Sequence, residues 1–283
     1  MAGFGCRDMV SPLRRVLLRS PDPAACTSWQ DYGWRAEPNP ARLVAEHEAL
    51  CSLLEEAGAE VVLAEGSVDG DPDAVYAFDP AVVAERGAIV LRPGKPGRRT
   101  EAEAARIALE AAGVPVAEQI EAPAVAEGGD FIRLDQGTLL AGRGYRTDSD
   151  GIWSVERALP EIEMLVFDLP HWHGDDEIMH LLSLLSPLDH DLAVGYLPLL
   201  PVRLVQLLRE REIQLIEVPD EEFESMGSNV LALGPRVALM LERNRETRRR
   251  LERAGVEVLV YTGEELSKGD GGPTCLTLPL LRD

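Results

Sequence analysis

The chain has 283 residues, 45% of them hydrophobic, which is enough for a sizeable core in one large domain or two ordinary ones. Its 49 acidic and 28 basic residues give a formal net charge of −21. This charge argues against nucleic acid as a partner, because phosphate backbones select basic surfaces. The sequence contains no run of 18 apolar residues and no apolar signal-peptide core, so we expect a cytoplasmic protein that does not span a membrane.

A unit of strand, helix and strand repeats five times along the chain. The copies are predicted over residues 14–64, 88–116, 138–170, 192–219 and 236–263. Three of the helices end in the similar segments "EAGAEV", "AAGVPV" and "RAGVEV", where the glycine suits the left-handed position after a helix. Strands that alternate with helices indicate an α/β fold.

Another short strand precedes each unit, and we call it the lead strand. The lead strands are predicted to begin near Val75, Gly128, His180, Ser228 and Cys275, at spacings of 47 to 53 residues. The fifth has no unit after it, so it must complete the unit that opens the chain. The sequence therefore predicts a closed ring of five ββαβ repeats, forming a single domain over residues 1–283.

Residues that can carry chemistry stand at the ends of these lead strands, which should converge on the ring axis. They are Asp79, Glu127, His180, Asn229 and Cys275. The stretch "GDGGPTCLTLP" then has a purpose, because its rigid turn aims the thiol of Cys275 at the shared centre.

These residue types fit covalent catalysis on a cationic substrate. A cysteine attacks as its thiolate, and a histidine can protonate a leaving group and then activate water. Two carboxylates beside such a pair would suit a guanidinium, which offers planar pairs of N–H donors. The scattered cysteines, with no CxxC pair, argue against a zinc cage or a disulfide framework.

Several motifs resemble the guanidino-group-modifying (pentein) superfamily, and most of all the dimethylarginine dimethylaminohydrolases. "EGGD" matches the catalytic-acid motif, "HLLS" the histidine motif and "DGGPTC" the nucleophile loop. The resemblance runs from about Pro12 onward. It implies a five-bladed α/β propeller in which Cys275 is the nucleophile, His180 the acid and base, and Glu127 the catalytic acid of the motif.

The resemblance also implies a substrate and its ligands. The predicted enzyme is an amidine hydrolase that cleaves a guanidino C–N bond of L-arginine or an N-methylated arginine. It would work through a thiouronium adduct, without metal or organic cofactor, and release citrulline with an amine or ammonia. The substrate-binding residues carried over are Asp73, Asp79, Arg98, Arg146 and Asp270, with Arg98 and Arg146 expected at the substrate carboxylate.

Two positions depart from the family pattern. Leu182 stands where deiminases and amidinotransferases usually have aspartate, and Phe78 replaces an acidic or other polar residue. We therefore expect Leu182 to form an apolar wall beside the guanidinium that tolerates an N-alkyl group. The segment "HWHGDDE", His171 to Glu177, places two histidines near carboxylates, but its spacing matches no structural zinc pattern and favours an exposed loop.

Other functions stay open at this point. Within the superfamily the alternatives are an arginine deiminase or dihydrolase and an amidinotransferase, in which an amine replaces water. A non-catalytic propeller that binds partners is the alternative of a different class, although it would need neither the cysteine nor the histidine. The sequence does not decide whether the chain forms a homodimer.

Overall fold

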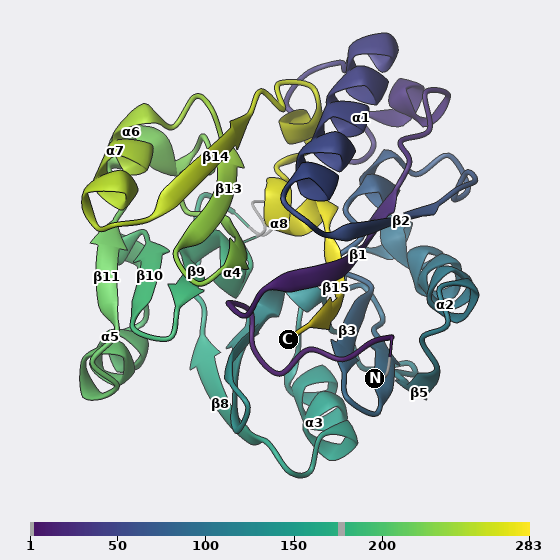
Figure 1. The fold of residues 1–283 in the computed structure, drawn as a ribbon. Helices are drawn as coiled ribbons and strands as arrows, with labels where there is room; N and C mark the ends of the chain where they lie inside the picture. Colours follow the sequence, from purple (N-terminus) through teal and green to yellow (C-terminus); the bar gives the residue numbers. More distant parts are fainter. Residues whose placement is uncertain (1–2, 175–178) are drawn as a thin grey trace.

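The computed structural model describes residues 3–174 and 179–283, and these form five three-stranded sheets arranged around a central axis (Figure 1). The sheets contain, from lead to outer strand, β15 (Leu278–Arg282), β1 (Leu13–Arg19) and β2 (Glu60–Ala64); β3 (Ala81–Ala84), β4 (Gly87–Val90) and β5 (Val116–Gln119); β6 (Phe131–Asp135), β7 (Thr138–Arg143) and β8 (Glu163–Asp168); β9 (Leu185–Asp189), β10 (Leu192–Gly195) and β11 (Gln214–Glu217); β12 (Leu231–Gly234), β13 (Val237–Leu241) and β14 (Glu257–Tyr261). This arrangement confirms the predicted ring of ββαβ repeats.

Every sheet follows one pattern of connection. The lead strand pairs antiparallel with the middle strand, and the middle strand pairs parallel with the outer one. A helix makes each parallel crossover, as parallel neighbours require. These helices are α1 (Pro40–Glu56), α2 (Glu101–Ala111), α3 (Ser149–Ala158), α5 (Val202–Glu210) and α7 (Arg245–Arg253).

Local sequence signals define the ends of these helices. Asn39 caps α1 by accepting a hydrogen bond from the N–H of Arg42, and Asp148 caps α3 in the same way through Gly151. Gly58, Gly113 and Gly255 have φ of 95°, 76° and 83°, which confirms the left-handed position predicted after three of the helices.

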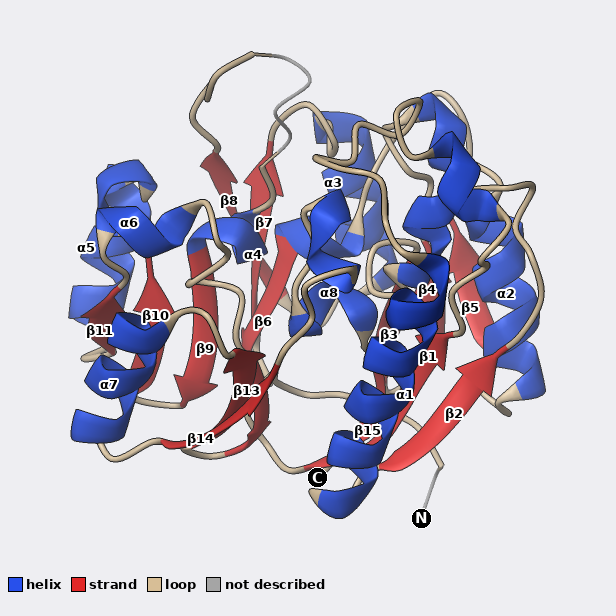
Figure 2. Cartoon of the chain, turned by 90° about the horizontal axis from the view of Figure 1, so that it is seen from above, coloured by secondary structure: helices blue, strands red, loops and turns tan. Residues whose placement is uncertain are grey.

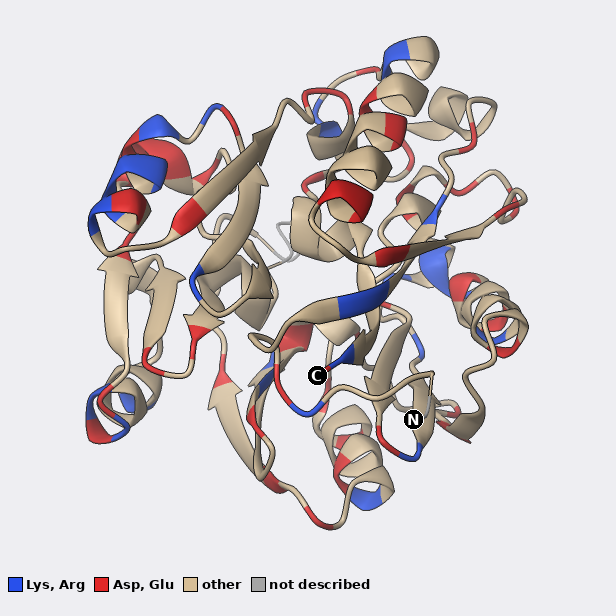
Figure 3. Ribbon diagram, viewed as in Figure 1, with Lys and Arg blue, Asp and Glu red and all other residues tan. Residues whose placement is uncertain are grey.

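Burial falls from the axis outward. The lead strands β3 and β12 and the middle strands β4 and β10 are buried almost throughout, whereas the outer strands β2, β5 and β11 are largely half-buried or exposed. Figure 3 shows the charged residues mostly on the outer helices and the connecting loops, with long uncharged stretches along the inner strands. No helix in the described part of the chain is long and apolar enough to cross a membrane.

The ring closes as predicted, because β15 near the C-terminus pairs with β1 near the N-terminus. The predicted starts of the lead strands, however, were wrong by three to six residues. The strands begin at Ala81, Phe131, Leu185, Leu231 and Leu278, and Cys275 itself lies in a short helix before β15. Apolar residues in these turns resemble strand residues in the sequence, but the backbone there curls to bring side chains to the axis.

Short helical segments occupy many of the connections (Figure 2). They are η1 (Ala25–Ser28), η2 (Pro72–Val75), η3 (Pro96–Arg98), η4 (Gly128–Asp130), α4 (Leu181–Leu184), η5 (Leu197–Leu199), α6 (Asp220–Phe223), η6 (Leu266–Gly269) and α8 (Pro273–Leu276). Of these, η2, η4, α4 and α8 each precede a lead strand, and the candidate catalytic residues lie in or beside them.

Candidate active site

A cleft of about 680 Å³ lies at the end of the ring where these short segments gather. The lining includes Asp79, Arg98, Arg146, His180 and Cys275, which come from segments far apart in the sequence. A space of this size is ordinary for a small-molecule site, where ~300–1,000 Å³ is typical.

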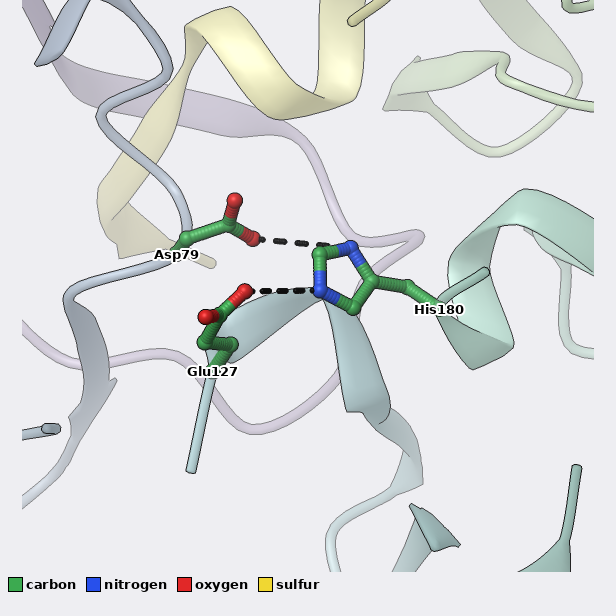
Figure 4. Close-up of side chains that lie close together, drawn as sticks. All are labelled: Asp79, Glu127 and His180. Carbon is green, nitrogen blue, oxygen red and sulfur yellow. Dashed lines mark hydrogen bonds and ion pairs between the residues drawn. The ribbon is translucent and has the colours of Figure 1, made fainter. Parts of the chain in front are cut away.

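His180 lies between two carboxylates (Figure 4). Its Nε2 is 2.9 Å from Oε2 of Glu127, and its Nδ1 is 3.8 Å from Oδ1 of Asp79. Burial alone would lower the pKa of His180, but the negative charges of Asp79, Asp130 and Glu127 raise it overall. The imidazole is therefore poised to hold a proton that it can donate.

Glu127 is fully buried and surrounded by donors. Its Oε1 accepts hydrogen bonds from the Gly94 N–H at 2.8 Å and from Arg146 Nε at 2.7 Å, and its Oε2 contacts Arg146 Nη2 at 2.6 Å. Burial would raise the pKa of Glu127, but Arg146, His180 and Arg98 hold it well below its usual range. Because these partners occupy most of its lone pairs, Glu127 has little capacity left to bind a substrate. Its carboxylate is instead suited to stay ionised and to orient His180.

Cys275 presents its thiol to the same cleft. The Asn229 side chain donates from Nδ2 to the sulfur at 3.1 Å, and the Cys275 carbonyl accepts from the Phe78 N–H at 3.1 Å. Burial, followed by the charge of Asp79, raises the pKa of the thiol to about 11, against lowering contributions from the Gly272 backbone, Asn229 and Arg98. Without a ligand the sulfur is therefore a neutral thiol, and a bound cation would favour the thiolate.

The glycines in the two loop motifs are there because side chains approach them closely. A Cβ at Gly129 would lie 2.4 Å from Nδ1 of His180, so "EGGD" makes room for the imidazole. A Cβ at Gly271 would lie 2.0 Å from the Tyr76 ring, and one at Gly272 would lie 2.6 Å from the Asn229 amide. The turn before Cys275 thus packs its bare backbone against the neighbours that hold the thiol in place.

Arg98 is buried in a network of carboxylates. Its Nη1 donates to Oδ2 of Asp79 at 2.8 Å, its Nε and Nη2 both bind Glu101, and its Nη1 is 4.0 Å from Glu127. In this geometry Arg98 balances the charge of Asp79 and Glu101. The predicted contact between Arg98 and a substrate carboxylate stays a prediction, as does that of Arg146, whose Nε and Nη2 are both on Glu127.

Asp73 and Asp270, the other predicted substrate ligands, also have protein partners. Asp73 accepts a hydrogen bond from Trp34 Nε1 at 2.7 Å and contacts Lys95 Nζ at 2.8 Å. Asp270, at a left-handed φ of 64°, forms an ion pair with Arg35. Both line the cleft, and their contact with a substrate stays a prediction.

Sequence reasoning missed three partners of the site: Trp34, Lys95 and Glu101. Glu101 stands three residues after Arg98 in "RRTE", a spacing at which helical residues meet, and this could have signalled the pair. Nothing in the local sequence links Trp34 to Asp73, which lies 39 positions further on.

The expectation for Leu182 was wrong. Leu182 is 3% exposed, packs in the apolar core with Phe78, and is not among the residues that line the cleft. The one-turn helix α4 points His180 toward the cleft and turns the side chain two positions later into the core. Residues 175–177 of "HWHGDDE" lie outside the described residues.

Among the described residues, Asp79, Glu127 and His180 could place three ligand atoms within 4.8 Å of one another, as a metal ion requires. However, both carboxylates already face arginine guanidinium groups. These positive charges oppose a further cation, so the donor set fits proton transfer better than metal binding.

Comparison with known proteins identifies the class. Residues 64–200 and 197–282 match the arginine deiminase family, so the chain belongs to this family, and the predicted superfamily is confirmed. Over 269 residues it is 26% identical to N(G),N(G)-dimethylarginine dimethylaminohydrolase of Streptomyces coelicolor, covering 95% of this chain and 98% of that protein. By contrast, the match to the arginine deiminase of Rhodococcus opacus, at 32% identity, spans only about half of that protein's length, 46%.

Solved structures agree on the fold. The chain superposes on dimethylarginine dimethylaminohydrolase of Pseudomonas aeruginosa, a cysteine-to-serine mutant complexed with citrulline, with a TM-score of 0.78 at 24% identity, covering 94% of this chain and 99% of that one. The N-terminal domain of ArgZ, covalently bonded to a reaction intermediate, gives a TM-score of 0.81 at 22% identity, covering 95% and 98%. The predicted five-bladed propeller is thereby confirmed.

Proposed function

We propose that the protein hydrolyses a guanidino C–N bond of L-arginine or an N-methylated arginine, with Cys275 as nucleophile. The observation that carries the proposal is the convergence of a thiol, a histidine bound to a buried glutamate, and a second carboxylate on one cleft. A binding module would have no need for this set. The names of relatives across nearly the whole chain support the same substrate class.

The first half-reaction begins when the substrate guanidinium enters beside Asp79. Its positive charge stabilises the thiolate, so the Cys275 proton leaves for solvent. The sulfur attacks the guanidinium carbon and forms an S–C bond. His180 donates its proton to the departing nitrogen, the C–N bond breaks, and an amine or ammonia leaves a cationic thiouronium group on Cys275.

In the second half-reaction, neutral His180 removes a proton from water as the oxygen attacks the thiouronium carbon. The tetrahedral adduct expels the Cys275 thiolate and loses a proton, giving a ureido product such as citrulline. The released amine takes up one proton overall, so the charge of the substrate guanidinium is balanced. Glu127 keeps the imidazole oriented throughout, since its own partners hold it ionised.

The amino acid head of the substrate would also lie in the cleft. Arg146 is the better candidate for its carboxylate, because its ion pair is with Glu127, whereas Arg98 is already held by three other carboxylates. Asp73 and Asp270, which line the cleft from separate loops, are the other candidate substrate ligands.

The test is a direct assay of turnover. We would incubate the protein with arginine, monomethylarginine, asymmetric dimethylarginine and agmatine, and measure ureido product and released amine separately. We expect citrulline from at least one arginine, and no turnover by Cys275→Ser, with Cys51→Ser as the matched control that keeps activity. Turnover by Cys275→Ser above a few percent, or no reaction of wild type with any guanidine, would refute the proposal.

A further inference from the structure

Asp130, the last residue of "EGGD", is a fully buried carboxylate that the proposed chemistry does not use. Its side chain does not line the cleft. Oδ1 accepts a hydrogen bond from the N–H of Leu181 at 3.0 Å, and Oδ2 accepts one from Oγ1 of Thr147 at 2.6 Å. These two partners directly follow His180 and Arg146 in the chain.

Thr147 extends this network to the third member of the site. Its Oγ1 accepts a hydrogen bond from the N–H of Glu127 at 3.1 Å. One carboxylate therefore links the backbone segments that carry Glu127, Arg146 and His180. The chain also keeps space for it, since a Cβ at Gly142 would lie 2.8 Å from Asp130 Oδ1 and 3.0 Å from Leu181 Cβ.

The charge of Asp130 acts on the imidazole. Two charged groups affect the pKa of Asp130: the charge of His180 lowers it and the charge of Glu127 raises it. Burial raises the pKa of Asp130 to about 6, so the carboxylate predominates above about pH 6. Around His180, the other charges are Asp79 from the loop before β3 and Glu127 beside η4. Arg98 and Arg146 reach Glu127, and Cys275 shares the cleft.

We propose that Asp130 is a positioning residue for His180: it fixes the backbone at Leu181 and supplies a buried negative charge that stabilises the protonated imidazole. The catalytic part of this inference rests on the proposed function, in which His180 donates a proton. The electrostatic part does not, because it concerns the free protein.

The experiment compares wild type with Asp130→Asn, which keeps the size and an accepting oxygen but removes the charge. We would titrate the five histidines by NMR in the absence of substrate and assign His180 with His180→Gln. The pKa of His180 should fall in Asp130→Asn, because a negative neighbour is lost. Asp135→Asn is the matched control and should leave it unchanged, because Asp135 lies at the far end of β6, the strand that follows Asp130, and pairs with Arg211.

Kinetics provide the second readout. With a substrate that the wild type turns over, kcat of Asp130→Asn should fall about 10-fold or more while KM changes little, since proton transfer by a positioned group is worth about 10²–10⁴-fold. A folded Asp130→Asn protein with an unchanged His180 pKa would overturn the inference. If wild type lacks turnover yet the His180 pKa shifts, the proposed function fails and the positioning role stands.

Should Asp130→Asn not fold, wild type alone decides. If Asp130 acts on His180, the two residues titrate as a coupled pair. The NMR titration curves of His180 and of the Asp130 carboxyl carbon should then share an inflection near pH 6. An Asp130 titration that leaves no trace on His180 overturns the inference.

Discussion

Replacing Glu127 with glutamine tests the centre of the proposed site, because it keeps the shape of the side chain and removes its charge. Glu127 is 0% exposed and balances Arg146, 2.6 Å away, with Arg98 at 4.0 Å. Neutralising one partner of a buried ion pair costs about 3–5 kcal/mol. We expect about 3 kcal/mol, the lower end, because the amide oxygen still accepts a hydrogen bond.

The pH dependence of this cost follows from the lowered pKa of Glu127. A carboxyl with a lowered pKa in the folded state stabilises the protein above its unfolded pKa, and this contribution is lost as the pH falls toward the folded value. The difference in unfolding free energy between wild type and Glu127→Gln should therefore be complete at neutral pH and shrink below about 4.5, the ordinary value for the group.

The assay is urea unfolding at neutral pH and near pH 4, together with steady-state citrulline formation. Glu103→Gln is the matched control, because Glu103 makes an exposed ion pair with Arg106 and such pairs contribute little. We expect kcat of Glu127→Gln to fall about 100-fold or more, as His180 loses its anionic partner. Stability equal to that of Glu103→Gln, or an unchanged kcat, would refute the reasoning.

Three further outcomes are expected. Asp79→Asn should raise KM about 10-fold or more for every guanidino substrate, because a hydrogen bond to a charged group is lost; steady-state kinetics with an unchanged KM would contradict this role. Alkylation of Cys275 by iodoacetamide in the free protein should accelerate until about pH 11, and a rate that levels off near pH 7 would mean a thiolate is already present. We also propose that residues 1–283 form one domain, so far-UV circular dichroism and tryptophan fluorescence should report a single coincident unfolding transition, whereas two separate transitions would indicate two domains.

The ring could be predicted from the sequence because the repeats have a regular spacing and their elements end at recognisable residues. Strand, helix and capping glycine recur at nearly equal intervals, so the position of Cys275 relative to His180 could be inferred without any contact between them in the sequence. The strand starts could not be predicted, because the segments at Gly128 and Cys275 are short and lead directly into apolar strand residues, and only packing at the axis curls them into helical turns.

The ion pairs of the site were beyond the reach of the sequence for a different reason. Which carboxylate pairs with which arginine depends on distances of a few ångströms between loops that lie 19 residues apart in the sequence. The sequence therefore identified Asp79, Glu127, Arg98 and Arg146 as a group and did not reveal that they pair with one another. Leu182 was misplaced because a one-turn helix reverses the direction of side chains only two residues apart.

The pairing of β15 with β1 has a consequence for synthesis of the protein on the ribosome. Strand β1 emerges at the beginning of translation and must wait for its antiparallel partner until more than 250 further residues have followed. Because β15 comes directly after Cys275, the same segment supplies the proposed nucleophile and the last strand of the ring. A nascent or truncated chain without it would have neither a closed propeller nor the proposed nucleophile, so we expect no active half-folded form.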